Sequence, residues 1–299
     1  MASLEELRNR IDGTKDLQSV VRVMKSLSAV TIGQYQAATR SLRDYQDVVD
    51  RSLQVALGDV RERPGASDDD DFEQALVAMG SDRGLCGRFN ESIAEEAEAL
   101  ARRRAKSSGR PPIVAIGTRL AGRLEAGGWK PHAVFSQPGT AEGLGRTVEG
   151  VLMALDDLRR TCGVTRTDII FSSEARGGGT RVENEILFPL DRALLRRIAE
   201  APWPTRKLPM ISGPEEEARS ALIRERLFVT LLRTGAESLA AEHASRLAAM
   251  QAAERNISDK LDELEAAFRR ERQDAITTEL LDIVSAYECL GADQRSCRE

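Results

Sequence analysis

The sequence is poor in the side chains that most often carry chemistry. Of its 299 residues only 4% are aromatic, two are histidines and four are cysteines. The cysteines form no C-x-x-C pair and show no metal-ligand spacing, so we expect reduced thiols and a cytosolic protein; they are Cys86, Cys162, Cys289 and Cys297. No run approaches the roughly 18 apolar residues of a membrane-spanning helix, which argues against an integral membrane protein. The net charge of -5 argues against a general nucleic-acid binder.

Proline is absent from the first sixty residues, and apolar residues recur there at helical spacing. Leu4, Leu7, Ile11 and Val21 illustrate the spacing, which predicts one amphipathic helix over residues 1–63. The stretch RERPGASDDDD then interrupts it with proline, glycine and an acidic run. A second proline-free pattern covers residues 214–290 and begins with acids, which favour a helix N-terminus. Patterns longer than about 25 residues indicate a coiled coil.

Short apolar runs alternate with helical stretches between residues 72 and 210. QALVAM, PIVAIG and DIIFSS read as strands, with ENEILFPL as a candidate fourth, and residues 91–106 and 142–162 read as helices. This alternation predicts a Rossmann-like α/β lobe. The expected fold class is therefore α/β plus coiled coil, with long antiparallel N- and C-terminal helices flanking the lobe. We expect the polar residues 291–299 to form a tail, because Gly291 suits the end of a helix.

The second helix is the longer one, so its C-terminal end should have no helical partner. At about 1.5 Å per residue the two helices measure roughly 85 and 115 Å. Counting from the lobe places Met24 and Lys25 near Met250, within about a turn of Arg246. Beyond Thr277 the helix should be unpaired and should need a sleeve made by another protein. Its apolar residues there are Leu280, Leu281, Ile283, Val284 and Tyr287.

Motifs for catalysis, cofactors and metals are weak. GTRLAGRL at residues 117–124 has two glycines of a phosphate loop but lacks its lysine and hydroxyl residue. RGGGTR at residues 176–181 favours a mobile surface loop over an anion site. His132 and His243 have no metal-ligand spacing, and we interpret His243 as a surface or seam residue. Asp68–Asp71 reads as a solvated linker rather than a cation site. We therefore expect no catalytic, cofactor or metal site.

Three motifs carry a resemblance to a known family. SDRGLCGRFN at residues 81–90 resembles the strand-turn signature of the gamma subunit of F-type ATP synthases. EELRNRIDGTKDLQSVVRVMKSLSA resembles the first helix of that family, and SRLAAMQAAERNISDKLDEL with RRERQDAITTELLDIVSA resembles its last. The chain departs from the family at Arg88 and Phe89, at Ala286 and Tyr287, and in its polar tail. These departures suggest a divergent bacterial branch.

The resemblance implies a mechanical function. Proteins of this family form the central stalk of a rotary motor, which turns inside a ring of alpha and beta subunits while its foot rides with the epsilon subunit on the membrane c-ring. It implies that ATP chemistry belongs to alpha and beta, and a peripheral location on the cytoplasmic side of the bacterial inner membrane. Whether the coupled ion is a proton or sodium is left open.

The resemblance also assigns contact residues. Arg272, Gln273 and Thr277 match positions that meet an acidic catch loop of beta. Arg246 and Met24 match the zone that faces an acidic lever of beta, where Lys25 is expected to add to a cationic patch with Arg246. Leu280, Ile283, Val284 and Tyr287 are expected to turn inside the sleeve.

Two other readings compete with the rotor. One is a coiled-coil adaptor with a Rossmann-like lobe, which has no catalytic role. The other is a nucleotide-binding enzyme that uses the turn Gly84–Gly87. The turn reads better as a corner of a structural lobe.

Overall fold

The computed structural model describes residues 4–57, 73–105, 109–175, 179–207 and 209–296. The chain divides into two compact units. The coil unit consists of Met1–Ser26 with Met250–Glu299, and the lobe unit is Leu27–Ala249. Two helices, α1 (Leu4–Leu57) and α6 (Glu215–Ser296), contribute residues to both units.

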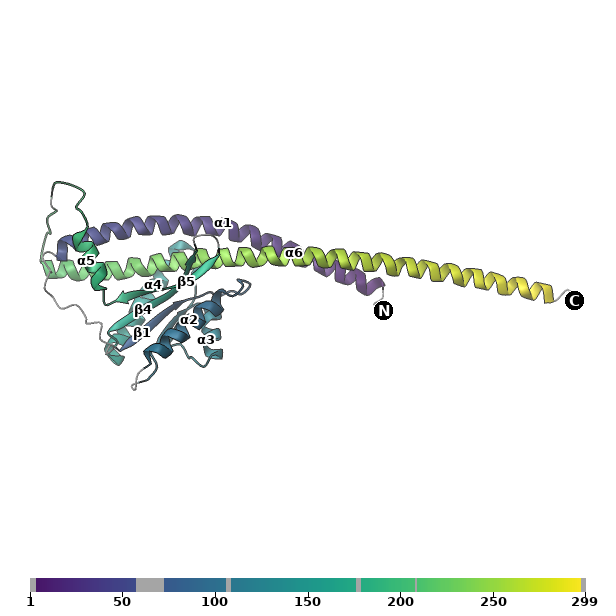
Figure 1. Cartoon of the computed structure of the whole chain (residues 1–299), viewed down its shortest axis with the longest axis horizontal. Coiled ribbons are helices and arrows are strands. Elements are labelled where there is room, and N and C mark those ends of the chain that lie inside the picture. The colour runs from purple at the N-terminus through teal and green to yellow at the C-terminus, as the bar shows by residue number, and fades with distance from the viewer. Residues whose placement is uncertain (1–3, 58–72, 106–108, 176–178, 208, 297–299) are drawn as a thin grey trace. The chain divides into compact units, whose positions relative to one another are not determined.

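A five-stranded sheet forms the centre of the lobe unit (Figure 1). Its strands are β1 (Gln74–Met79), β2 (Ile113–Ile116), β3 (Ala133–Phe135), β4 (Arg166–Glu174) and β5 (Thr180–Phe188). The order across the sheet is β3-β2-β1-β4-β5, in which β5 is antiparallel to β4 and the other neighbours are parallel. All six residues of β1 are buried, as expected for a central strand covered on both faces.

Helices cover the two faces of the sheet as two separate apolar clusters. On one face lie α2 (Phe89–Arg104) and α3 (Thr118–Ala126), which bury Ile93 and Leu124 against the alternate residues of β1 and β2. The other face packs against α4 (Ala141–Cys162) and α6, where Leu158 and Leu231 are fully buried. The short helix α5 (Arg192–Glu200) follows β5.

In the coil unit, buried residues repeat at coiled-coil spacing. Leu7, Ile11 and Val21 are buried on α1, as are Ile257, Leu261 and Leu264 on α6. Ion pairs join Lys15 to Glu265 at 3.6 Å and Lys25 to Glu254 at 2.5 Å, which makes the two helices antiparallel. The same register places Leu4 opposite about residue 276.

The structure confirms the fold class and extends the predicted elements. The strands at QALVAM, PIVAIG, DIIFSS and ENEILFPL are β1, β2, β4 and β5. The sequence reading missed β3, α3 and α5, which are three, nine and nine residues long. Residues 68–71 and 176–178 lie outside the described residues. Within the described part of the chain, no helix is long and apolar enough to cross a membrane.

The predicted helix end at Leu290 is wrong. Helix α6 continues through Gly291 to Ser296. A glycine inside a helix costs only about 1 kcal/mol relative to alanine, so a single one among good helix formers does not terminate it. Helix α6 begins within one residue of its predicted start, and residues 58–63 of the predicted first helix lie outside the described residues.

Candidate functional site

The turn SDRGLCGRFN lies where open α/β sheets usually bind ligands. Chain order reverses at β1, because β2 lies on one side of it and β4 on the other. Ligands of such sheets occupy the crevice at this switch point, beyond the carboxyl ends of the strands. Ser81 follows β1 at that end and is completely buried. The nucleotide-binding reading can therefore be judged from what fills this crevice.

The anion at the crevice is a side chain of the protein itself. One carboxylate oxygen of Asp82 accepts a hydrogen bond from the backbone N–H of Thr118 at 2.8 Å, and the other accepts from the backbone N–H of Gln137 at 2.9 Å. Thr118 is the first residue of α3, whose N-terminus would otherwise attract a phosphate. Asp82 thus occupies the position of a bound anion.

Gly117 explains why a glycine-rich turn is present without a phosphate loop. Its φ is +105°, a region that side chains avoid, and an added Cβ would lie 2.6 Å from the backbone nitrogen of Ser81. The turn before α3 therefore packs directly on the backbone that follows β1. Gly87, at φ +59°, serves the turn itself as predicted, whereas Gly84 does not have a positive φ.

Helix α6 closes the other side of the crevice. Ser238 donates a hydrogen bond to the carbonyl oxygen of Met79 at 3.0 Å, and Ser245 donates to that of Cys86 at 2.8 Å. Arg246 donates to the carbonyl oxygen of Gly84 at 3.4 Å. These bonds fix the turn after β1 against the helix, in the lobe unit.

A buried ion pair lies behind these contacts. The carboxylate of Glu242 accepts hydrogen bonds from Arg246 and from the side-chain amide of Gln137. Glu242 and Arg246 are 2% and 5% exposed. Burial raises the pKa of Glu242, although Arg246 and Gln137 oppose that shift. The polar groups of the crevice therefore satisfy one another.

His243 is part of the same cluster. Its ring stacks on Tyr35 of α1 with the ring centres 6.1 Å apart, and its Nδ1 lies 3.4 Å from a guanidinium nitrogen of Arg246. Burial, with the charges of Arg246 and Arg83, lowers the pKa of His243 to about 4. A neutral imidazole accepting from Arg246 fits this environment, and the predicted seam position is confirmed.

Arg246 and Lys25 do not form the free cationic patch that the sequence suggested. The guanidinium of Arg246 is bound to Glu242 inside the lobe unit, and the ammonium of Lys25 is bound to Glu254 inside the coil unit. The hydrogen bond from Lys25 lowers the pKa of Glu254. The charge of Arg22, which lies 3.8 Å from the same carboxylate, lowers it in addition. Met24 is half-buried beside them.

The C-terminal part of the coil unit has the opposite character. Arg272, Gln273 and Thr277 are all exposed. The hydroxyl of Thr277 donates to the carbonyl oxygen of Gln273 at 2.9 Å, so its own proton is already used. The exposed large apolar residues there are Ile276, Leu280, Leu281, Ile283 and Val284, which are 48–66% exposed. Tyr287 lies beyond the residues whose side chains the structure describes.

Sequence reasoning missed the residues that fill the crevice. Asp82 and Gln137 belong to different loops, and nothing in their spacing links them. Glu242 lies four residues before Arg246, which is a usual ion-pair spacing on one helix face and could have signalled the pair. Among the described residues, no group of three histidine, cysteine or acidic side chains could hold a metal ion.

Comparison with known proteins agrees with this geometry. The chain is 28% identical to an ATP synthase gamma chain of Paramagnetospirillum magneticum, over 97% of this chain and 100% of that one. It is 27% identical to an ATP synthase gamma chain of Cytophaga hutchinsonii, over 97% and 99%. A family model described as ATP synthase matches residues 3–290. The chain belongs to the ATP synthase gamma family.

Solved structures of similar fold come from a mitochondrial ATP synthase. A chain of the Euglena gracilis mitochondrial ATP synthase has a TM-score of 0.65 and 15% sequence identity. The match covers 97% of the present chain and 95% of the Euglena chain. A rotor chain of the same enzyme in another rotational state has a TM-score of 0.60 at 14% identity, over 91% and 98%. The gamma-family chain is thus a subunit of an ATP-synthesising enzyme complex.

Proposed function

We propose that the chain is the rotor that transmits torque between an ion-driven membrane ring and a catalytic alpha–beta hexamer. The single observation that carries this is α6, a continuous helix of 82 residues that forms an antiparallel pair with α1 in the coil unit. At 1.5 Å per residue it is about 120 Å long, which suits a shaft. Torque carried by such a shaft couples ion transport to ATP synthesis or hydrolysis.

The rotor is proposed to have no ATP chemistry of its own. In open α/β sheets the crevice at the switch point is the usual ligand site, and here Asp82, Glu242 and Arg246 fill it. Catalysis would then belong to the alpha and beta subunits, and the shaft would act on them by rigid-body contact.

The contact surface with the hexamer is proposed to lie at the C-terminal part of the coil unit. Arg272 and Gln273 are exposed and have N–H donors that suit an acidic loop of beta. Thr277 would contribute only its acceptor, because its hydroxyl proton is already donated. The apolar residues Leu280, Ile283 and Val284, with Tyr287, would turn inside an apolar sleeve, since burying one large apolar side chain is worth about 1.5–3 kcal/mol.

The remaining assigned residues have a narrower role in this proposal. An exposed ion pair contributes only about 0.2–1 kcal/mol, so a contact between Lys25 and the acidic lever of beta would be too weak to stop rotation. Met24 would lie beside that contact. Arg246 would act from inside, by holding the lobe against α6. The lobe end would meet the epsilon subunit and the c-ring, on the cytoplasmic side of a bacterial inner membrane.

Co-purification tests the assembly. Tagged full-length chain is expressed with alpha and beta homologues from a bacterial relative, and the purified material is analysed for composition and ATP hydrolysis. We expect all three chains in one active complex. A chain that purifies only as its own dimer supports the adaptor reading and contradicts the rotor.

Truncation tests the contact surface in that complex. Ending the chain after Leu290 removes the polar end but leaves the exposed apolar residues, so assembly and most turnover are expected to remain. Ending it after Thr277 removes Leu280, Ile283 and Val284 and is expected to weaken assembly or coupling by about tenfold or more, the effect of losing about 1.5–3 kcal/mol of burial. Equal behaviour of the two truncations would show that no sleeve holds this end.

A further inference from the structure

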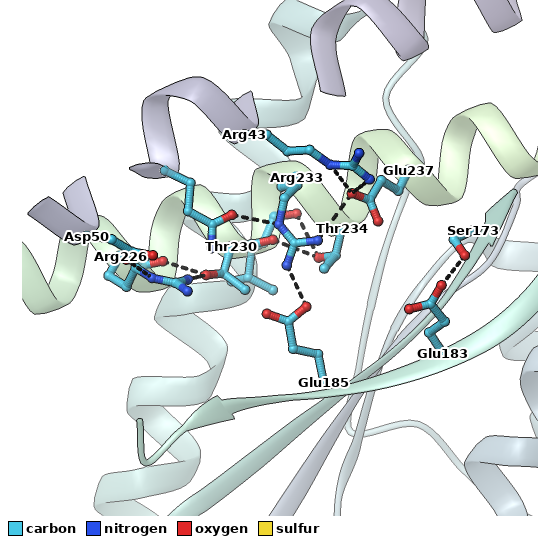
Figure 2. A network of polar contacts seen from close by, with 12 residues as sticks. Arg43, Asp50, Ser173, Glu183, Glu185, Arg226, Thr230, Arg233, Thr234 and Glu237 are labelled. Atoms are coloured by element: carbon cyan, nitrogen blue, oxygen red, sulfur yellow. Dashed lines mark hydrogen bonds and ion pairs between the residues drawn. The ribbon is translucent and has the colours of Figure 1, made fainter. Parts of the chain in front are cut away.

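A single arginine in the lobe unit joins three elements (Figure 2). The guanidinium of Arg233, on α6, donates to the side-chain oxygen of Gln46 on α1 at 2.7 Å. It also donates to Glu185 on β5 at 2.5 Å and to Glu237 on α6 at 3.2 Å. Because guanidinium is planar and its donors are fixed, these three bonds define one orientation of the three elements.

The arginine is largely buried, although Arg233, Gln46 and Glu185 also line a cavity and the side chain of Glu185 is 34% exposed. The side chains of Arg233 and Glu237 are 12% and 8% exposed, and Glu237 also accepts from Arg43 of α1 at 2.8 Å. Burial by itself lowers the pKa of Arg233, but the carboxylates of Glu185 and Glu237 outweigh it and raise the value. An ion pair with two partners in such a setting is stronger and more directional than one in water.

A second ionic contact lies two turns before Arg233 on α6. Arg226 donates to Asp50 of α1 at 2.5 Å and to the hydroxyl of Thr230. This contact ties α1 to α6, whereas Arg233 also reaches the sheet. The loss of Arg233 would therefore leave the two helices joined and remove this tie to the edge strand.

Glu185 belongs to the strand at the edge of the sheet, where apolar packing is less directional than an ion pair. Strand β5 is the edge of the sheet and pairs on one side with β4. A cavity of about 760 Å³ adjoins it, lined in part by Asp47, Asn184, Asp191 and Arg197. The apolar contacts nearby, such as Leu187 with the cluster of Leu231, are non-directional. Near this edge of the sheet, the ionic contact supplies a directional tie between β5 and the two helices.

We propose that Arg233 is a positioning residue for torque transmission, which holds the edge strand β5 in one orientation against the helices α1 and α6 through Glu185 and Gln46. The inference rests on the proposed rotor function. Torque entering at the lobe then reaches the shaft without slack. Without Arg233, part of each rotation is lost as twisting at the edge of the sheet.

Three variants and one control separate this role from general stability. Arg233→Met keeps the volume of the side chain and removes its charge, whereas Arg233→Lys keeps the charge and loses the fork. Glu185→Gln keeps Arg233 and weakens its bond to the strand. The control is Glu183→Gln, two residues away on β5. In the described part of the chain Glu183 bonds with Ser173 of β4, as Figure 2 shows, and with Arg181 of β5.

The first measurement uses the isolated full chain. Spin labels are placed at Asp44→Cys on α1 and Thr180→Cys on β5, with Cys162, Cys289 and Cys297 replaced by serine. The width of the label-to-label distance distribution is expected to grow about twofold in Arg233→Met, less in Arg233→Lys and Glu185→Gln, and not in the control, as loss of a desolvated directional contact implies. An unchanged width in Arg233→Met overturns the proposal, whether or not the rotor assembles.

The second measurement uses the assembled enzyme in vesicles. For Arg233→Met we expect ATP hydrolysis within about twofold of the wild type and ions pumped per ATP reduced about twofold or more, with partial rescue by Arg233→Lys. If Arg233→Met fails to assemble, Glu185→Gln is measured in its place. Normal pumping per ATP in a variant with a widened distribution overturns the transmission role. Absence of a wild-type complex with alpha and beta instead contradicts the proposed function.

Discussion

Glu242 meets Arg246 in the lobe unit where the two residues are 2% and 5% exposed, whereas Glu254 meets Lys25 in the coil unit with side chains that are 26% and 31% exposed. The first pair also receives Gln137 and borders a turn whose carbonyls bond to α6. The second pair lies on the side of two helices and borders water. The lobe unit uses its polar groups to hold itself together, and the coil unit leaves most of its surface available to a partner.

The apolar residues differ in the same way. In the lobe unit, large side chains such as Phe171 and Leu231 are fully buried between sheet and helices. In the coil unit, Ile283 is 66% exposed and Leu281 61%. An apolar surface that is left open along a helix marks an interaction site, whereas a closed one marks structure. The following predictions test this contrast, from the largest expected effect to the smallest.

Removing one acid from each ion pair should give very different losses of stability. Glu242→Ala leaves the charge of Arg246 buried without its partner and is expected to lower the free energy of unfolding by about 3–5 kcal/mol. Glu254→Ala leaves Lys25 and Arg22 in water and is expected to change it little. Urea unfolding of the isolated full chain, followed by circular dichroism, measures both. Similar midpoints for the two variants would show that the buried pair is not a stabilising element of the lobe.

Adding one methyl group should also separate the two units. In Gly117→Ala the new Cβ would lie 2.6 Å from the backbone of Ser81 at a φ of +105°, so we expect a loss of about 3 kcal/mol. Gly13 lies in α1 of the coil unit with nothing within 4 Å of an added Cβ, and Gly13→Ala is expected to stabilise by about 0.4–1 kcal/mol. Thermal unfolding of the two variants gives the comparison. A stable Gly117→Ala would contradict the close approach of the two turns.

Acid should loosen the lobe unit through His243. Its folded pKa of about 4 lies below the ordinary value of 6.5, so the folded state binds fewer protons in that range. Stability from this group is therefore complete above about pH 6.5 and falls as the pH drops towards 4, by about 1–3 kcal/mol. His243→Phe keeps a ring on Tyr35 and removes the titration. The urea midpoint should fall further between pH 7.5 and pH 4.5 in the wild type than in His243→Phe. An equal fall in the two proteins would contradict the prediction.

The long elements could be predicted from the sequence because each one repeats its signal many times. α1 and α6 contain dozens of residues at helical spacing, and β1, β2 and β4 are continuous apolar runs bounded by glycine or polar residues. The missed elements are too short to show a period. β3 has three residues, and α3 has glycines at 117 and 122 that resemble a loop.

The site was harder to predict than the fold because a helix face does not reveal what covers it. Arg246 reads as an exposed cation on α6, yet a turn more than 150 residues earlier in the chain covers it. Arg272 and Gln273 are exposed even though the register places the first turns of α1 at their level, so they lie on a face of α6 that α1 does not cover. Asp82 and Gln137 meet only through the topology of the sheet, which spacing along the chain cannot express.

Asp82 makes the N-terminus of α3 a poor binding site for anions from solution. Its carboxylate is bound to the N-terminus of α3 as a covalently tethered ligand, so its effective concentration at that helix does not depend on anything in solution. Free phosphates and nucleotides would have to displace an anion that cannot diffuse away.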